Sequence, residues 1–279
     1  MPDPLEKFVT QVSAARKGYQ LPSRAAERAE QLARETLRLL FPHFADPRRF
    51  APADVRAELD QVGGELAEFL EGLGHRREEA RGLSDRFLAE LPEVAGLLAL
   101  DAEATFLADP AARTRDEVIL AYPGVYAIAC YRIAHVLCRL GVGLLPRLIT
   151  ESAHRATGID INPGATIGRS LAIDHGTGIV IGETTVIGDR VRLYQGVTLG
   201  ALSVRKEFAR QKRHPTIEDD VVIYANATIL GGDTVIGAGS VIGGNVWLTH
   251  SVPPGSVVTH MAAVERAREA EEPLLEFNI

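Results

Sequence analysis

Five polar side chains in the second half of the chain are candidates for a functional site: Asp160, Asp174, His175, Arg213 and His214. The aspartates and histidines among them are of the types that carry out acid–base chemistry. Histidine is the natural general base near neutral pH. A carboxylate that is hydrogen-bonded to the other ring nitrogen of the histidine fixes its tautomer and stabilises the imidazolium as it forms. Each histidine taken alone is more often structural, but two histidines with acids nearby favour a catalytic site.

These residues are not spaced as metal ligands. The chain has no His-x-x-x-His segment and no closely spaced pair of cysteines. A zinc hydrolase is therefore disfavoured, and we expect the chemistry to need no metal.

The spacing of apolar residues changes near Gly158, and this change predicts the elements that position these polar residues. Before it, apolar residues recur at steps of three and four, which predicts amphipathic helices separated by prolines and glycines. After it, aliphatic residues recur every six positions, which is typical of a hexapeptide β-helix whose sixth side chains point inward. The stepped groups are Ile161, Ile167, Ile173; Ile187, Leu193, Leu199; Ile217, Ile223, Ile229; and Ile236, Ile242, Leu248.

Three hexads make one triangular coil, so the four groups predict four complete coils. A two-residue excess between Ile173 and Ile187, and a one-residue excess between Ile229 and Ile236, fit bulged corners. The stretch from Leu199 to Ile217 lacks aliphatic residues at the required places and predicts an extruded loop. A β-sandwich rich in glycine and isoleucine is the alternative for the whole segment.

Function is expected at the corners, outer faces and loop of this solenoid, because an aliphatic interior has no room for polar groups. Asp160 stands fourteen residues before Asp174, and one coil takes about eighteen residues. Asp160 and His175 could therefore approach each other within or across the first coil. His214 follows the extruded loop, so we expect it to meet His175 across a subunit boundary.

The sequence thus predicts an α+β chain of three parts. An α-helical domain covers residues 1–158, a parallel β-helix with an extruded loop covers 159–258, and a short helix and tail cover 259–279. The charged helical faces are expected to be solvated, with a surface for packing another subunit as the alternative.

Composition excludes other classes of protein. The net charge of -7 over 279 residues argues against a nucleic-acid partner, which needs clustered basic residues. The first residues lack the features of a signal peptide, and the most apolar segment, 118–149, is interrupted by charges. We expect a cytoplasmic protein that binds no membrane.

Four segments of the solenoid resemble one family, the serine O-acetyltransferases, which are hexapeptide-repeat acyltransferases. They are 160–168 (DINPGATIG), 173–184 (IDHGTGIVIGET), 197–200 (VTLG) and 213–215 (RHP), and 109–111 (DPA) and 131–135 (YRIAH) extend the similarity upstream. The resemblance implies a left-handed β-helix and an activity. That activity is transfer of acetyl from acetyl-CoA to the hydroxyl of L-serine, which gives O-acetyl-L-serine in cysteine biosynthesis.

The resemblance also implies roles for individual residues. The catalytic residues would be His175, Asp160 and His214; Asp109, Asp174 and Arg213 would hold the amino and carboxylate groups of serine; and Gly200, Ala201 and Ala225 would bind acetyl-CoA. These types suit their tasks, because arginine presents a planar fork to a carboxylate and acids attract an ammonium group.

Partners follow from the same resemblance. Acetyl-CoA is the co-substrate, with no metal, and the expected assembly is a homotrimer or a dimer of trimers whose sites are shared between subunits. The tail, ending in Ile279, is expected to insert into the active site of O-acetylserine sulfhydrylase, and a frayed terminus is the alternative.

Two other functions stay open from the sequence. An enzyme of the same architecture that acetylates a sugar or antibiotic hydroxyl would need only one catalytic histidine and no residues for a zwitterion. A non-catalytic scaffold would use the solenoid only to hold the sulfhydrylase.

Overall fold

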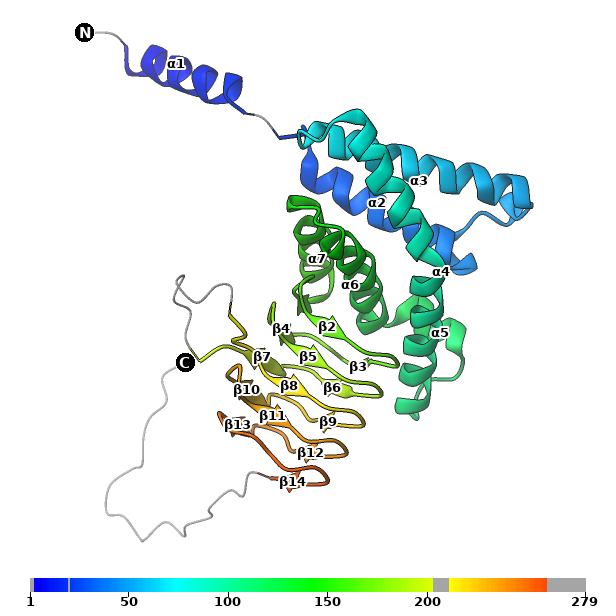
Figure 1. The fold of residues 1–279 in the computed structure, drawn as a ribbon, viewed down its shortest axis with the longest axis vertical. Helices are drawn as coiled ribbons and strands as arrows, with labels where there is room; N and C mark the ends of the chain where they lie inside the picture. The colour runs from blue at the N-terminus through cyan, green and yellow to red at the C-terminus, as the bar shows by residue number, and fades with distance from the viewer. Residues whose placement is uncertain (1–2, 20, 203–210, 260–279) are drawn as a thin grey trace, which may run out of the picture.

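The computed structural model describes residues 3–19, 21–202 and 211–259 and shows helices followed by a solenoid of short strands (Figure 1). The helices are α1 (Pro4–Lys17), α2 (Ala25–Leu40), α3 (Pro52–Gly72), α4 (Arg77–Ala108), α5 (Arg115–Ala121), α6 (Pro123–Arg139) and α7 (Leu144–Thr157), with two short 3-10 turns, η1 (Pro42–Phe44) and η2 (Pro47–Arg49). The predicted α+β organisation is confirmed. Residues 260–279, which include most of the predicted C-terminal part, lie outside the described residues.

The helical half has its own apolar core, and its last helix leads directly into the solenoid. Apolar side chains spaced three and four apart, such as Leu66, Phe69 and Leu70 of α3, are fully or almost fully buried in that core. Helix α7 ends at Gly158, whose φ of 72° is in the left-handed region that favours glycine. The turn at Gly158 directs the chain into the first strand.

No single helix within the described ranges is long and apolar enough to cross a membrane. Only α5 and α6 taken together pass that test, by length and composition alone, and they are bent by 73° at their junction.

The solenoid is built from strands of two or three residues that form three parallel sheets, one for each side of the coil. They are β1 (Asp160–Ile161), β2 (Thr166–Ile167), β3 (Ala172–Asp174), β4 (Val180–Ile181), β5 (Val186–Ile187), β6 (Arg192–Tyr194), β7 (Thr198–Gly200), β8 (Thr216–Ile217), β9 (Val222–Ile223), β10 (Thr228–Leu230), β11 (Val235–Ile236), β12 (Val241–Ile242), β13 (Trp247–Leu248) and β14 (Val257–Val258). Sheet A has the order β1-β4-β7-β10-β13, sheet B the order β11-β8-β5-β2, and sheet C the order β14-β12-β9-β6-β3.

The predicted number of four coils is wrong, because sheets A and C each contain five strands. The prediction missed Val258 of β14, which pairs in register with Ile242, and Ile181, which points inward and pairs in register with Ile161 and Leu199. Ile181 stands eight residues after Ile173, so a strict period of six passes over it. The two extra residues are taken up at the corner between β3 and β4, where His175 (φ 56°) and Gly176 (φ 84°) adopt left-handed conformations. This expanded corner therefore carries a predicted catalytic residue.

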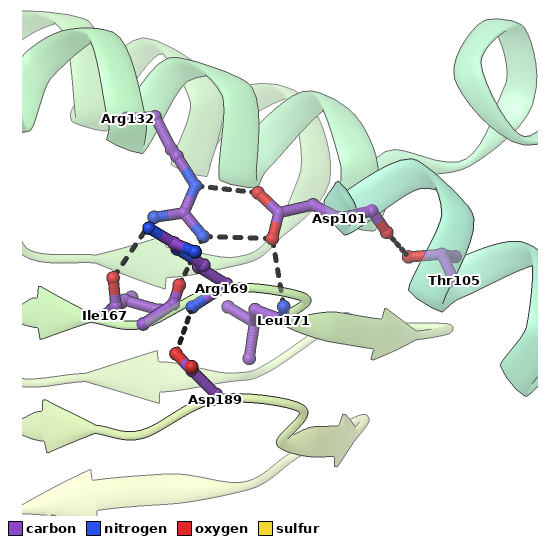
Figure 2. A network of polar contacts seen from close by, with 8 residues as sticks. Asp101, Thr105, Arg132, Ile167, Arg169, Leu171 and Asp189 are labelled. Carbon is purple, nitrogen blue, oxygen red and sulfur yellow. Dashed lines mark hydrogen bonds and ion pairs between the residues drawn. The ribbon is translucent and has the colours of Figure 1, made fainter. Parts of the chain in front are cut away.

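A buried ion pair fastens the helices to the first coil (Figure 2). The guanidinium of Arg132 on α6 donates to Asp101 on α4 from Nε (2.7 Å) and Nη2 (2.9 Å), and also to the carbonyl oxygens of Ile167 and Gly168. Asp101 in turn accepts from the backbone N–H of Leu171 at 2.9 Å. The corner between β2 and β3, and so the start of the strand leading to His175, is held by this pair.

Candidate active site

The first group of predicted site residues lies at the expanded corner between sheets C and A. Asp174 is the last residue of β3, and His175 follows it with its side chain 72% exposed. The Nδ1 atom of His175 lies 3.7 Å from Oδ1 of Asp174. An imidazole that is open to solvent and next to a carboxylate can take a proton from a bound hydroxyl group.

Asp109 reaches this corner from the end of α4. Its pKa is lowered by a hydrogen bond from the Tyr122 hydroxyl and by the backbone N–H of Ala111, and the nearby His175 lowers it further. Tyr122, which sequence reasoning missed, precedes α6 and lies 2.5 Å from Oδ2 of Asp109. Asp109, Asp174 and His175 thus form one polar group with Tyr122 at its edge.

Asp160 opens β1 in sheet A, in register with Val180 of the next coil. Among the described residues, the Asp160 carboxylate forms an ion pair with Arg147 of α7, at 4.0 Å between Oδ1 and Nη1. No hydrogen bond joins Asp160 to His175 there. The predicted pairing of Asp160 with His175 therefore stays a prediction.

Asp160 also belongs to a group of residues that could hold a metal ion, together with Glu151 and His154. Their ligand atoms lie within 4.8 Å of one another. The guanidinium of Arg147 already forms an ion pair with Glu151, so the group has a cation of its own. The expectation that no metal is needed stays a prediction.

His214 lies at a different corner, between sheets A and B, where it is buried against the turn from β4 to β5. Its Nδ1 atom is 3.1 Å from the backbone nitrogen of Thr184 and 2.9 Å from the Thr184 hydroxyl. A backbone N–H can only donate, so Nδ1 is the acceptor and the neutral ring carries its proton on Nε2. Burial, with the positive charges of Arg213 and Lys212, lowers the pKa of His214 to about 4. In this tautomer the neutral ring can donate a hydrogen bond from Nε2.

The segment before His214 is held by the same threonine, which sequence reasoning also missed. The Thr184 hydroxyl accepts from the backbone N–H of Arg213 (2.9 Å) and of His214 (3.1 Å). Lys212 donates from Nζ to the carbonyl oxygens of Thr184 (2.9 Å) and His214 (2.7 Å), and Arg213 forms an ion pair with Glu183. The end of the extruded loop is thus fixed against the solenoid.

Gly182 makes room for the ring of His214, because a Cβ at Gly182 would overlap its Cδ2 and Nε2 atoms. We expect Gly182→Ala to displace the ring from Thr184 and to lower kcat/KM by about 100-fold, the cost of a displacement of about 1 Å at a catalytic group. Steady-state kinetics beside a thermal melt will measure this. Gly96→Ala is the matched control, since no atom lies within 4 Å of a Cβ added there. Equal kinetics for both variants would contradict the prediction.

The predicted acetyl-CoA residues are divided between the same two corners. Gly200 ends β7 of sheet A, and Ala201 follows it at the corner between sheets A and B. Ala225 follows β9 on the side of His175, next to Tyr224, whose ring stacks on that of Tyr194 at 4.9 Å between centroids. Residues 203–210 of the loop lie outside the described ranges.

Comparisons with known proteins point to one family. No family model matches this chain. It is 54% identical over 187 residues to a plasmid serine acetyltransferase of Synechococcus elongatus, a match that covers 65% of this chain and 58% of the relative. It is 48% identical over 148 residues to the serine acetyltransferase of Helicobacter pylori, covering 53% of this chain and 84% of the relative. The chain belongs to the serine acetyltransferases.

Solved structures of serine acetyltransferases have the same fold. Isoform 3 of Entamoeba histolytica, crystallised with cysteine, superposes with a TM-score of 0.76 at 35% identity over 84% of each chain. The enzyme of Neisseria gonorrhoeae, in complex with serine, gives 0.59 at 29% identity over 84% of this chain and 95% of that one. The resemblance inferred from the motifs is confirmed, and this serine acetyltransferase is an acyltransferase enzyme.

Proposed function

We propose that this chain transfers acetyl from acetyl-CoA to the hydroxyl of L-serine with His175 as the general base. His175 removes the hydroxyl proton as the serine oxygen forms a bond to the thioester carbonyl carbon. The tetrahedral intermediate then loses the CoA sulfur, and the proton passes from His175 to the thiolate. The observation that carries this proposal is the exposed His175 ring beside Asp174 and Asp109 at the expanded corner.

The other predicted residues are assigned by charge and geometry. Asp109 and Asp174 would hold the ammonium group of serine, and Arg213 its carboxylate, through a two-pronged contact. Asp160 would orient His175, as the family resemblance implies. His214, with its proton on Nε2, would donate to the oxyanion or to the substrate.

An assembly of subunits is part of the proposal. His175 and His214 lie at different corners of the same solenoid, separated by sheet A. One site can contain both only if a second subunit brings its A–B corner to the C–A corner of the first. A homotrimer does this three times with a single type of interface. Pairing of two trimers through the helical half, and the cytoplasmic location, remain predictions from the sequence.

Gly200, Ala201 and Ala225 would then line one acetyl-CoA groove between neighbouring solenoids. The division of these residues between the two corners supports a shared groove. We also propose that cysteine occupies the serine site and inhibits. The complex of a relative with cysteine supports this.

Release of CoA thiol tests the function directly. Acetyl-CoA is supplied with L-serine, L-homoserine or a sugar in parallel, with and without added cysteine. We expect turnover with serine and its suppression by cysteine. Turnover with the sugar alone would favour the rival acetyltransferase, and no turnover at all would favour the scaffold.

We propose O-acetylserine sulfhydrylase as a partner, bound through the C-terminal Ile279, which lies outside the described residues. Deleting the last four residues is expected to abolish co-purification with the sulfhydrylase while acetyl transfer continues, because it removes Ile279 and leaves a shorter tail that ends at Leu275. Pull-down and the thiol assay on the same sample measure both. Binding that survives the deletion would show that the tail is not the contact.

A further inference from the structure

The hydroxyl of Tyr122 completes the hydrogen bonding of the Asp109 carboxylate. It donates to Oδ2 at 2.5 Å, while the backbone N–H of Ala111 donates to Oδ1 at 2.8 Å. Asp109 lies beyond the last turn of α4 and belongs to no regular element. Without a partner on each oxygen, its carboxylate could turn about the side-chain bonds. With both partners in place it has one orientation.

The parts that carry this pair are anchored to the solenoid near His175. Gly124 lies so close to β3 that an added Cβ would come 2.5 Å from the carbonyl oxygen of Ile173. Tyr122 therefore immediately precedes a helix that packs against β3, the strand that ends at Asp174. On the other side, Arg192 of β6 donates to the carbonyl oxygen of Ala108 at 3.3 Å, which ties down the end of α4.

The protonation states of Tyr122 and Asp109 fit a hydrogen bond from a neutral hydroxyl donor to an anionic carboxylate. The hydrogen bond to Asp109, together with partial burial and the nearby acids Glu117 and Asp174, raises the pKa of Tyr122 to about 12. The same bond is the largest cause that lowers the pKa of Asp109. At neutral pH the tyrosine keeps its proton and the aspartate is charged.

We infer that Tyr122 is a positioning residue that sets the affinity of the site for the ammonium group of serine, by fixing the direction of the Asp109 carboxylate. The inference rests on the proposed function, in which Asp109 binds that group. Tyr122 does not touch the reacting atoms in this assignment. Its removal therefore weakens serine binding and leaves the acetyl-transfer step unchanged.

The test is Tyr122→Phe in the full-length protein, which removes one oxygen atom and keeps the ring. We expect the KM for L-serine to rise by roughly tenfold to a hundredfold, the range for loss of a hydrogen bond to a charged group. The KM for acetyl-CoA and kcat should change by less than about twofold. Tyr126→Phe, four residues further along α6 and lining a cavity against α2, is the matched control and should leave the serine KM unchanged.

A double-mutant cycle with Asp109→Asn separates positioning from a general structural effect. In the Asp109→Asn background, Tyr122→Phe should add almost nothing to the serine KM. An unchanged serine KM in the single variant, or the same penalty in both backgrounds, would overturn the inference. A wild type that turns over acetyl-CoA without using serine would instead overturn the proposed function, and the inference with it.

Discussion

Removing the imidazole of His175 is expected to lower serine-dependent kcat by about 10²- to 10⁴-fold, the usual contribution of a general base. His175→Asn is the better variant, because the residue has a φ of 56° and asparagine tolerates the left-handed conformation better than alanine. The side chain is exposed and fills no core space, so the fold should not change. Thiol release at saturating serine and acetyl-CoA, beside circular dichroism, measures the effect.

His250→Asn is the control for this experiment, since it makes the same change at another exposed histidine, between β13 and β14 at the far end of the solenoid. It should keep most of the activity. If His175→Asn turns over serine at the wild-type rate, the base lies elsewhere. If the wild type is itself inactive, the solenoid acts as a scaffold.

Breaking the buried pair of Asp101 and Arg132 should have the largest effect on stability. Asp101→Ala leaves the guanidinium buried with only the carbonyl oxygens of Ile167 and Gly168, and frees the N–H of Leu171. Loss of one partner from a buried ion pair costs about 3–5 kcal/mol in the free energy of unfolding. Denaturant unfolding at a fixed protomer concentration measures it, because assembly adds to apparent stability.

Glu90→Ala removes the partner of Arg139 in an ion pair that is largely exposed, and should cost at most about 1 kcal/mol. A second comparison is the double variant Asp101→Leu and Arg132→Met. Apolar replacement of both partners avoids an unpaired charge, so the double variant should be more stable than Asp101→Ala. An Asp101→Ala protein as stable as Glu90→Ala would show that the pair does not hold the two halves together.

The features that could be predicted from the sequence are those that repeat from one coil of the solenoid to the next. Inward aliphatic residues recur in a solenoid because each coil stacks on the last, so the period of six identified every strand of the described solenoid except β4 and β14. Ile181 was missed because the corner before it is longer by two residues. The additional length lies at the corner that carries His175.

Residues that act through a distant partner could not be predicted in the same way. Tyr122 is thirteen residues from Asp109, and Thr184 is thirty residues from His214. No periodicity connects such pairs, and tyrosine and threonine are common in solvent-exposed turns. The motif resemblance identified Asp109 and His214, but the hydrogen bonds that orient them depend on how α5, α6 and residues 212–214 pack against the solenoid.

The separation of His175 and His214 between two corners has a consequence for subunits that carry different defects. In the proposed trimer, each site takes one corner from each of two neighbours. A subunit damaged at His175 and a subunit damaged at His214 still contribute one intact corner each. A mixed assembly of the two therefore contains sites with both histidines, although neither chain alone can form one. In the proposed trimer, activity would therefore be a property of an interface, and two inactive chains would restore each other.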